Sequence, residues 1–279
     1  MLSILLGLSA AFSWGAGDFY GGLASRKTGP YRAVFFGEAV GIVFVIAAAF
    51  MFRQAFPSWW FCLLAAAAGA IGTLGILLLY QAMTRGLMSI AAPVSALMAA
   101  VIPIVIGAFT DGLPKWVTLI GFGFALFAIW FVSQSENGVK DIFAHVADLK
   151  LPLVAGVGFG LYFALMHSAT RTSTLWPMVV SRSSGMIVMT VFLLARRDSW
   201  KVESPAWLAI TLNGILDVGG NVLYILASQM GRMDVAAILS SLFPASTVLL
   251  AALVLKERVT RPQSFGILLA LIAIILMTL

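Results

Sequence analysis

Residues 86–97 read GLMSIAAPVSAL, and residues 231–242 read GRMDVAAILSSL. At an offset of 145 residues six of the twelve positions are identical, and Ile90 falls opposite the similar Val235. Other matches at offsets of 144 or 145 follow in the same order along the chain: Gly41 with Gly185, Tyr80 with Tyr224, Gly121 with Gly266 and Ala125 with Ala270. This ordered series predicts that the second half of the chain is a copy of the first.

The composition predicts which solvent surrounds the protein. Hydrophobic residues make up 61% of the chain and charged residues 10%, whereas a soluble domain carries roughly 25% charged residues. The chain cannot cover its surface with polar groups, so we expect lipid to surround it. A helix needs about 20 apolar residues to cross a bilayer. The candidate spans are residues 2–22, 31–52, 59–83, 89–109, 116–134, 151–170, 176–195, 206–230, 235–255 and 263–279.

Ten helices in two copies give two five-helix halves, residues 1–134 and 151–279, joined by a linker loop at residues 135–150. Because five is odd, the second half must enter the membrane from the side opposite to the first. The predicted fold is therefore an all-α integral membrane protein with two inverted five-helix repeats around a central cavity. Inverted repeats are typical of secondary transporters, whose substrate site lies near the bilayer midplane between the halves.

The basic residues predict the orientation of the chain, and their spread through short loops does not favour nucleic-acid binding. The loops that follow odd-numbered spans hold twelve Lys and Arg residues, and those that follow even-numbered spans hold four. Cytoplasmic loops carry the excess of basic residues in membrane proteins. Both termini are therefore expected outside the cytoplasm, in a multi-pass protein of the cell (inner) membrane.

Enzyme signals are weak, and no catalytic residue is assigned. Residues 15–18 match the GxGD string of intramembrane aspartyl proteases, but the other aspartate available, Asp217, follows Leu216 and not a tyrosine. The order of the two motifs along the chain is also reversed. No Walker loop is present, and His145, His167 and Cys62 lie far apart in the sequence. We expect no enzyme activity, no cofactor and no metal site.

Several motifs resemble one transporter family over essentially the whole chain. They are Trp14 with Gly15, the AAxxSxL motif in the 89–109 and 235–255 spans, and KERVT at residues 256–260 followed by Gly266. Together they resemble EamA-type members of the drug/metabolite transporter superfamily and, within it, YddG-type exporters of aromatic and other amino acids. The resemblance implies a basket of helices around a central cavity and efflux of small metabolites.

The chain departs from that family pattern in two places. Lys256 precedes Glu257 where many relatives have Gly-Glu, and the first half has Asp111 and Gly112 at the matching place. The resemblance also implies cytoplasmic termini, which is the opposite of what the loop charges predict, so the sequence leaves the orientation open.

The clearest polar stripe lies in the 206–230 span. Asn213, Asp217, Asn221 and Tyr224 fall on one face of a helix, with Asp217 close to the middle of the membrane. A carboxylate at this depth could couple transport to protons. It could instead be a structural group that pairs with Arg182 in the 176–195 span, and the sequence leaves both alternatives open.

Other candidates come from several spans. Asp18, Glu38 and His167 join Asp217 as coupling candidates, although pairing or an interfacial hydrogen bond would also explain each of them. The further candidates for substrate binding are Trp14, Tyr80, Ser95, Tyr162, Phe163 and Ser240. The aromatic side chains could stack on a substrate and the serines could donate hydrogen bonds to it, or all of them could serve ordinary helix packing.

The leading functional prediction is a secondary active transporter that exports small organic metabolites, amino acids foremost, by alternating access. The alternatives are a passive facilitator or channel, and an efflux carrier for drugs or organic cations. The expected partners are a small-molecule substrate, protons and the lipid bilayer, with no nucleic acid, and the expected state is a monomer.

Overall fold

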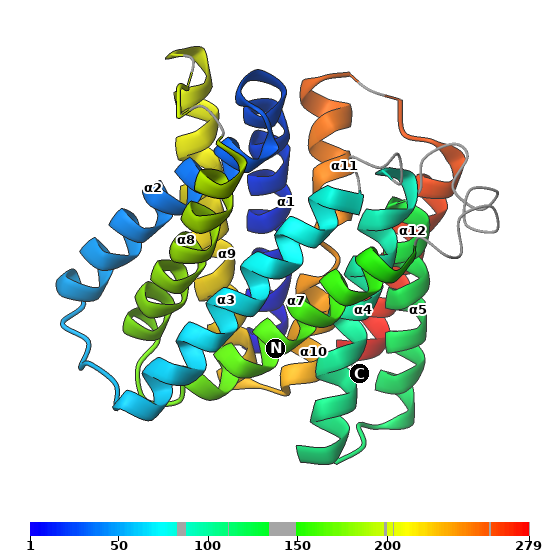
Figure 1. Cartoon of the computed structure of the whole chain (residues 1–279). Helices are drawn as coiled ribbons and strands as arrows, with labels where there is room; N and C mark the ends of the chain where they lie inside the picture. Colours follow the sequence, from blue (N-terminus) through cyan, green and yellow to red (C-terminus); the bar gives the residue numbers. More distant parts are fainter. Residues whose placement is uncertain are drawn as a thin grey trace.

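The computed structural model describes residues 1–82, 88–110, 112–133, 149–197, 200–202, 204–256 and 258–278, and their regular structure is helical throughout (Figure 1). The helices are α1 (Leu2–Thr28), α2 (Pro30–Met51), α3 (Trp59–Ala82), α4 (Met88–Thr110), α5 (Trp116–Ser133), α7 (Lys150–Ala169), α8 (Leu175–Arg196), the 3-10 helix η3 (Ser204–Ala206), α9 (Trp207–Met230), α10 (Met233–Ser240), α11 (Phe243–Val254) and α12 (Arg261–Thr278). The predicted linker lies almost entirely outside the described residues, as do Asp111 and Glu257.

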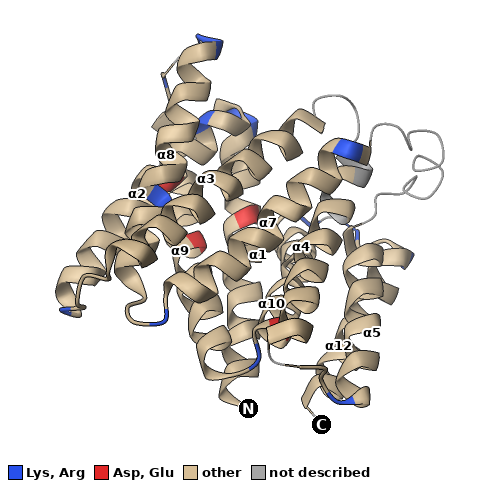
Figure 2. Cartoon of the chain, turned by 60° about the horizontal axis from the view of Figure 1, so that its bottom comes forward, with Lys and Arg blue, Asp and Glu red and all other residues tan. Residues whose placement is uncertain are grey.

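The predicted membrane spans are confirmed. Nine helical segments of the described chain are long and apolar enough to cross a membrane, with α10 and α11 counted as one. The tenth span is α4, of which residues 94–110 form a shorter apolar helix. Both termini lie at one end of the bundle (Figure 2). We call this end, with residues 52–58, 112–115, 170–174 and 231–232, the terminal face, and the end with residues 29, 200–202 and 258–260 the distal face.

One predicted span is not a single helix. The segment expected at residues 235–255 breaks at Ser241 and Leu242 into α10 and α11. Pro244, in the first turn of α11, cannot donate to the carbonyl of Ser240, and its ring would clash with that carbonyl in a continuous helix. Its counterpart in the first half is Ala99, and α4 runs on through that position.

The helix packing repeats with the sequence. α1 packs on α9 as α7 packs on α3, and α2 packs on α9 as α8 packs on α3. α1 lies against α10 and α11 as α7 lies against α4, while α2 packs on its own counterpart α8, and α5 packs on α12. Helices of one half therefore pack chiefly on helices of the other, so the two halves interlock (Figure 1). The equivalence of these contacts relates the two halves by a pseudo-twofold axis.

Close helix contacts at glycines occur in equivalent places of both halves. A Cβ atom at Gly69 of α3 would overlap the backbone of Ser181 in α8, and one at Gly214 of α9 would overlap the carbonyl oxygen of Gly37 in α2. Gly214 lies 145 positions after Gly69, and Ser181 lies 144 after Gly37. Small residues let membrane helices approach closely enough for backbone contact. The repeat seen in the sequence is thus present in the packing as well.

Replacing Gly69 with alanine is expected to destabilise the fold, because the added methyl group would have to displace the α8 backbone. We expect a loss of about 2–3 kcal/mol in the free energy of unfolding, in the range of overpacked cores. Gly22 of α1, beside which no atom lies within 4 Å, is the matched control. Unfolding in detergent should separate Gly69→Ala from Gly22→Ala, and equal stability of the two variants would contradict the packing described.

Candidate functional site

An arginine within the bundle pairs with two carboxylates from different helices. Arg182 of α8 donates from Nη1 to Oε2 of Glu38 in α2 at 2.6 Å, and from Nη2 to Oδ2 of Asp217 in α9. The Arg182 side chain is 8% exposed, whereas those of Glu38 and Asp217 are 24% and 37% exposed. Glu38 and Arg182 are 144 residues apart, so this ion pair joins equivalent positions of the two halves across the pseudo-twofold axis.

Hydrogen bonds extend this ionic group to α7. Asn221 donates from Nδ2 to the carbonyl oxygen of Asp217 at 2.7 Å and to its Oδ2 at 3.3 Å. The hydroxyl of Tyr162 in α7 donates to Oδ1 of Asn221 at 2.5 Å. Polar groups that lack water are costly unless they are paired, and these bonds connect α2, α8, α9 and α7 in one network. We call Glu38, Arg182, Asp217, Asn221 and Tyr162 the central polar network.

Asp18 of α1 lies beside this network and is exposed although it is in a membrane span. Gly17 and Gly21, on one side of it, pack against α9, and Gly15 packs against α11. An α-helix has 3.6 residues per turn, so Asp18 lies between the side of α1 that contacts α9 and the side that contacts α11. Its side chain is therefore on the face of α1 directed into the bundle. Its charge lies near enough to interact with Asp217 and with Tyr80 of α3. Figure 2 shows acidic residues within the bundle and most basic residues near helix ends.

An aromatic cluster lies on the terminal side of the central polar network. The Trp14 ring of α1 stacks on Phe163 of α7 at 5.6 Å and on Tyr224 of α9 at 5.9 Å between centroids, and the Phe243 ring of α11 meets it edge-on at 6.5 Å. The Tyr224 hydroxyl donates to the carbonyl oxygen of Phe163 at 3.2 Å. Phe163 and Tyr224 are 8% and 0% exposed, so the cluster is closely packed between the network and the terminal face.

Hydrogen bonds tie the helix ends on the terminal face. Oε1 of Gln54 accepts from the backbone N–H groups of Thr174 and Leu175 at 3.0 and 2.8 Å, which satisfies free donors at the start of α8. Gln229 at the end of α9 donates to the Thr170 hydroxyl at 3.2 Å, just after α7. A hollow of about 310 Å³ lies among these residues. The coupling candidate His167 lies in this region, and its carbonyl oxygen accepts from Gln229 at 2.8 Å.

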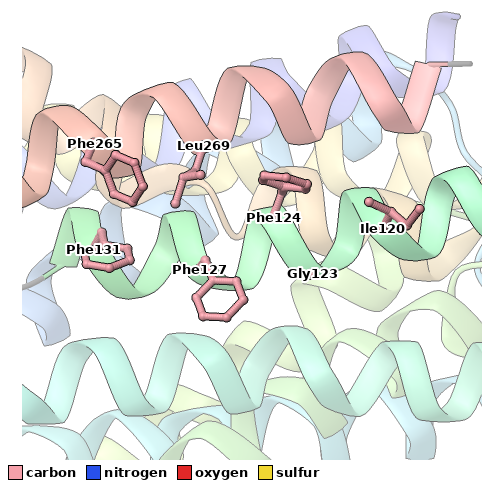
Figure 3. A pocket seen from close by; sticks show the side chains of 7 residues that line it. All are labelled: Ile120, Gly123, Phe124, Phe127, Phe131, Phe265 and Leu269. Carbon is pink, nitrogen blue, oxygen red and sulfur yellow. The ribbon is translucent and has the colours of Figure 1, made fainter.

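A larger hollow, of about 530 Å³, lies between α5 and α12 away from the polar network. Figure 3 shows its side chains, which are apolar, and Phe127 and Phe265 among them are 62% and 49% exposed. In a membrane such a surface faces lipid. The hollow contains no polar side chain that could fix the orientation of a solute, so the candidate site is the polar one.

The structure brings together six of the ten predicted substrate-binding residues. These are Trp14, Tyr162, Phe163, Asp217, Asn221 and Tyr224, with the coupling candidates Glu38 and Asp18 beside them. Tyr80 also lies near Asp18, but its ring packs on Tyr31 at 5.8 Å. Whether these residues bind substrate stays a prediction.

The other three predicted residues make helix–helix contacts. Asn213 donates from Nδ2 to the carbonyl oxygen of Gly17 at 2.9 Å. The Ser240 hydroxyl donates to the carbonyl oxygen of Gly7 at 3.4 Å. Ser95 is 2% exposed. A Cβ atom added at Gly156 of α7 would lie 2.5 Å from the carbonyl oxygen of Ser95, so the two helices approach closely at this point.

The sequence does not predict two residues of the site. It suggests Arg182 only as a possible structural partner of Asp217, and no pattern in the sequence points to Phe243. The offset of 144 residues that relates Glu38 to Arg182 was available as a signal, because a two-fold axis brings equivalent positions of neighbouring helices together. Among the described residues, no group of three or more His, Cys, Asp or Glu side chains is placed to hold a metal ion.

Comparisons with known proteins agree with this architecture. A crystal structure of another protein superimposes with a TM-score of 0.83 over 99% of this chain and 98% of that one, at 17% sequence identity, which supports the fold. An uncharacterized protein of Methanocaldococcus jannaschii is 31% identical over 131 residues, which are 94% of that protein but 47% of this chain. That relative is therefore about half as long as this chain and matches about half of it.

The sequence profile of the EamA-like transporter family matches residues 1–134 and residues 149–279, so it covers both halves. This confirms the family predicted from the sequence motifs and fits the ten-helix fold. The chain therefore belongs to the EamA-like transporter family, and it is a multi-pass membrane transporter of small solutes.

Proposed function

We propose that this transporter exports small organic metabolites, amino acids foremost, by alternating access between its two halves. The observation that carries the proposal is the difference between the two sides of the central polar network. On the terminal side the aromatic cluster is packed closed, whereas Asp18, on the distal side, is exposed. A solute could reach the network from one face only, as a carrier requires in each of its two states.

The chemistry of the site favours a zwitterion with an apolar side chain. Arg182 offers positive charge, and Asp18, Glu38 and Asp217 offer negative charge, so both charged groups of an amino acid find partners without a net charge entering the membrane. Tyr162 is hydrogen-bonded to Asn221 of the network, and the Trp14 ring stacks on the neighbouring Phe163. These rings supply apolar surface for the side chain of the substrate. The resemblance to YddG-type exporters points to the same substrate class.

The charge distribution supports an opening toward the cytoplasm. Of the Lys and Arg residues that the structure describes in or beside loops, most lie at the distal face, and basic loops are retained in the cytoplasm. We propose that the distal face is cytoplasmic, that both termini are outside, and that the protein resides in the inner membrane of the cell. In the conformation described, the site would then be open for loading from the cytoplasm.

Counterflow in proteoliposomes tests the proposal. Vesicles loaded with unlabelled L-phenylalanine or L-leucine should accumulate labelled substrate transiently above equilibrium, because a carrier exchanges one molecule for another. Equilibration without an overshoot would indicate a channel, and no uptake of any amino acid would contradict the substrate class.

An organic-cation carrier is the second candidate. The observation that favours it is the excess of negative charge at the site, where three carboxylates lie near the single Arg182. The same vesicles distinguish it, since a labelled quaternary ammonium ion should then show the overshoot and amino acids should not. Aromatic rings such as Trp14 also attract such cations.

A further inference from the structure

The two sides of the site are built from equivalent residues. Gly15 of α1 lies against the backbone of Thr247, where a Cβ atom would come within 2.9 Å, and Gly160 of α7 lies against Ile102. Gly160 lies 145 positions after Gly15, and Thr247 lies 145 positions after Ile102, so the two contacts are equivalent and α1 corresponds to α7 at an offset of 145. At this offset, which also relates Gly69 of α3 to Gly214 of α9, the counterparts of the cluster residues Trp14, Phe163, Tyr224 and Phe243 are Phe159, Asp18, Leu79 and Met98.

The counterpart set is not packed together. Along the described chain Phe159 has no ring contact, Leu79 packs near Ala82 at the end of α3, and Asp18 is exposed. α7 packs against α9 and α10 near the terminal face, whereas the equivalent pairs, α1 with α3 and α1 with α4, stay farther apart. One of two equivalent gates is therefore closed, and the other is open.

If the halves exchange conformations, as alternating access requires, Asp18 moves to an environment equivalent to that of Phe163. Phe163 is 8% exposed and is covered by two aromatic rings. A charged carboxylate without a partner is strongly disfavoured in such surroundings. The closed distal gate therefore requires that the charge of Asp18 be neutralised.

Among the described residues, the helices around Asp18 bring no cationic side chain that could neutralise it, apart from Arg182, which is already paired. α9 brings Asp217, which has the same sign and is held by Arg182 of α8. α3 brings Tyr80, and α2 brings Tyr31 and Glu38, which also pairs with Arg182. α11 has no titratable residue, and Asp234 of α10 pairs with Arg232 at the terminal face.

We propose, on the basis of the alternating access proposed above, that Asp18 is a charge lock on the distal gate, which closes only when a positive charge neutralises this carboxylate. The charge comes either from a proton or from the ammonium group of the solute. A proton taken from water on the distal side forms an O–H bond with the carboxylate on closing and returns to the same side on reopening. This step by itself moves no net charge across the membrane.

Distance measurements between two spin labels test the lock in full-length protein with Cys62→Ala. One pair, Arg26→Cys on α1 and Gln81→Cys on α3, reports on the distal gate. Lowering the pH from about 8 to about 5.5 should raise the ratio of short to long distances by up to about tenfold per pH unit, as expected for linkage to one proton. Asp18→Asn, and Asp18→Phe, which copies the equivalent residue, should favour the short distance at every pH, and Asp18→Glu should keep the slope.

Two solutes at about pH 8 distinguish the two sources of charge. L-phenylalanine carries an ammonium group and should close the gate in the parent protein, whereas 3-phenylpropionate lacks it and should not. If only low pH closes the gate, the proton is the source, and if L-phenylalanine closes it, the ammonium group suffices. The lock is overturned if Asp18→Asn has the same pH slope and the same open fraction as its parent.

A second label pair separates failure of the lock from failure of the proposed function. Arg171→Cys and Met230→Cys, both exposed on the terminal face, report on the other gate. If the two faces change in opposite directions but Asp18→Asn behaves like its parent, alternating access stands and the charge lock is wrong. If neither face changes under any condition, alternating access itself fails.

Discussion

Replacing Arg182 with glutamine is expected to leave little folded transporter in the membrane. The change removes the partner of both Glu38 and Asp217, whose carboxylates lie inside the bundle. Removing one partner of a fully buried ion pair destabilises a protein by about 3–5 kcal/mol, because a charge is left without compensation. The partial exposure of Glu38 and Asp217 places the expected loss at the lower end of this range. Detergent-solubilised Arg182→Gln should therefore elute mainly as aggregate in size-exclusion chromatography and should unfold at a lower temperature than the parent protein.

A triple variant is the matched control for this prediction. Arg182→Gln combined with Glu38→Gln and Asp217→Asn leaves no charge in the ionic group, so most of the lost stability should return, while the exchange of amino acids should not. Since protons also neutralise carboxylates, the single variant should recover part of its stability as the pH falls. A single variant as stable as the parent at neutral pH would show that Arg182 does not hold these carboxylates.

Replacing Trp14 with alanine is expected to uncouple transport. Trp14 contacts Phe163, Tyr224 and Phe243, which come from three other helices, and the ring also fills the space beside Gly220 of α9. Without the ring, the terminal gate cannot close against the interior. We expect the counterflow overshoot to fall about tenfold, equivalent to roughly 1.4 kcal/mol against the closed gate, while passive leak of the same solute rises.

The conservative variant Trp14→Phe separates gating from stability. It keeps an aromatic ring in the cluster and should retain most of the overshoot. Loss of a large buried side chain also costs about 3–5 kcal/mol of stability, so transport must be normalised to the amount of folded protein. An intact overshoot in Trp14→Ala would mean that the aromatic cluster is not the closed gate.

The membrane spans could be predicted from the sequence because the thickness of the bilayer sets the length of a membrane helix, and an apolar stretch of that length is visible in the sequence. The break at Ser241 and Leu242 was not predicted, although Pro244 carries the signal, because proline is tolerated in membrane helices when neighbours satisfy the freed groups. Pro93 and Pro103 lie within α4, which is one continuous helix, so the presence of a proline does not by itself predict whether a membrane helix breaks.

The polar residues show what helical periodicity cannot predict. The spacing of Asn213, Asp217 and Asn221 indicates a shared helix face, but not which helices approach it. In the structure, α1 and α2 are rich in glycine beside Asn213, so its side chain is enclosed between them, whereas Asp217 meets Arg182. The pairing left open by the sequence is thus present, and it makes Asp217 a less direct candidate for proton coupling than the exposed Asp18.

Differences between the two halves carry as much information as the matches. The Glu38–Arg182 pair uses equivalent positions with opposite charges, which satisfies both across the pseudo-twofold axis. Asp18 and Phe163 are equivalent positions with different polarity, and they lie at the two gates of the proposed transport path. Function is therefore expected where the repeat departs from exact symmetry.

A reversible cross-link on the terminal face tests the central claim most directly. Thr170 and Gln229, whose side chains are hydrogen-bonded at 3.2 Å, connect α7 to α9 beside the closed gate. In a protein with Cys62→Ala, cysteines at these two positions joined by a short, reducible thiol reagent should abolish counterflow, and reduction should restore it. The control pair, Phe131→Cys with Phe265→Cys, joins α5 to α12 on the lipid-facing side and should leave counterflow unchanged. Full counterflow in protein that is completely cross-linked between α7 and α9 would contradict alternating access through this gate.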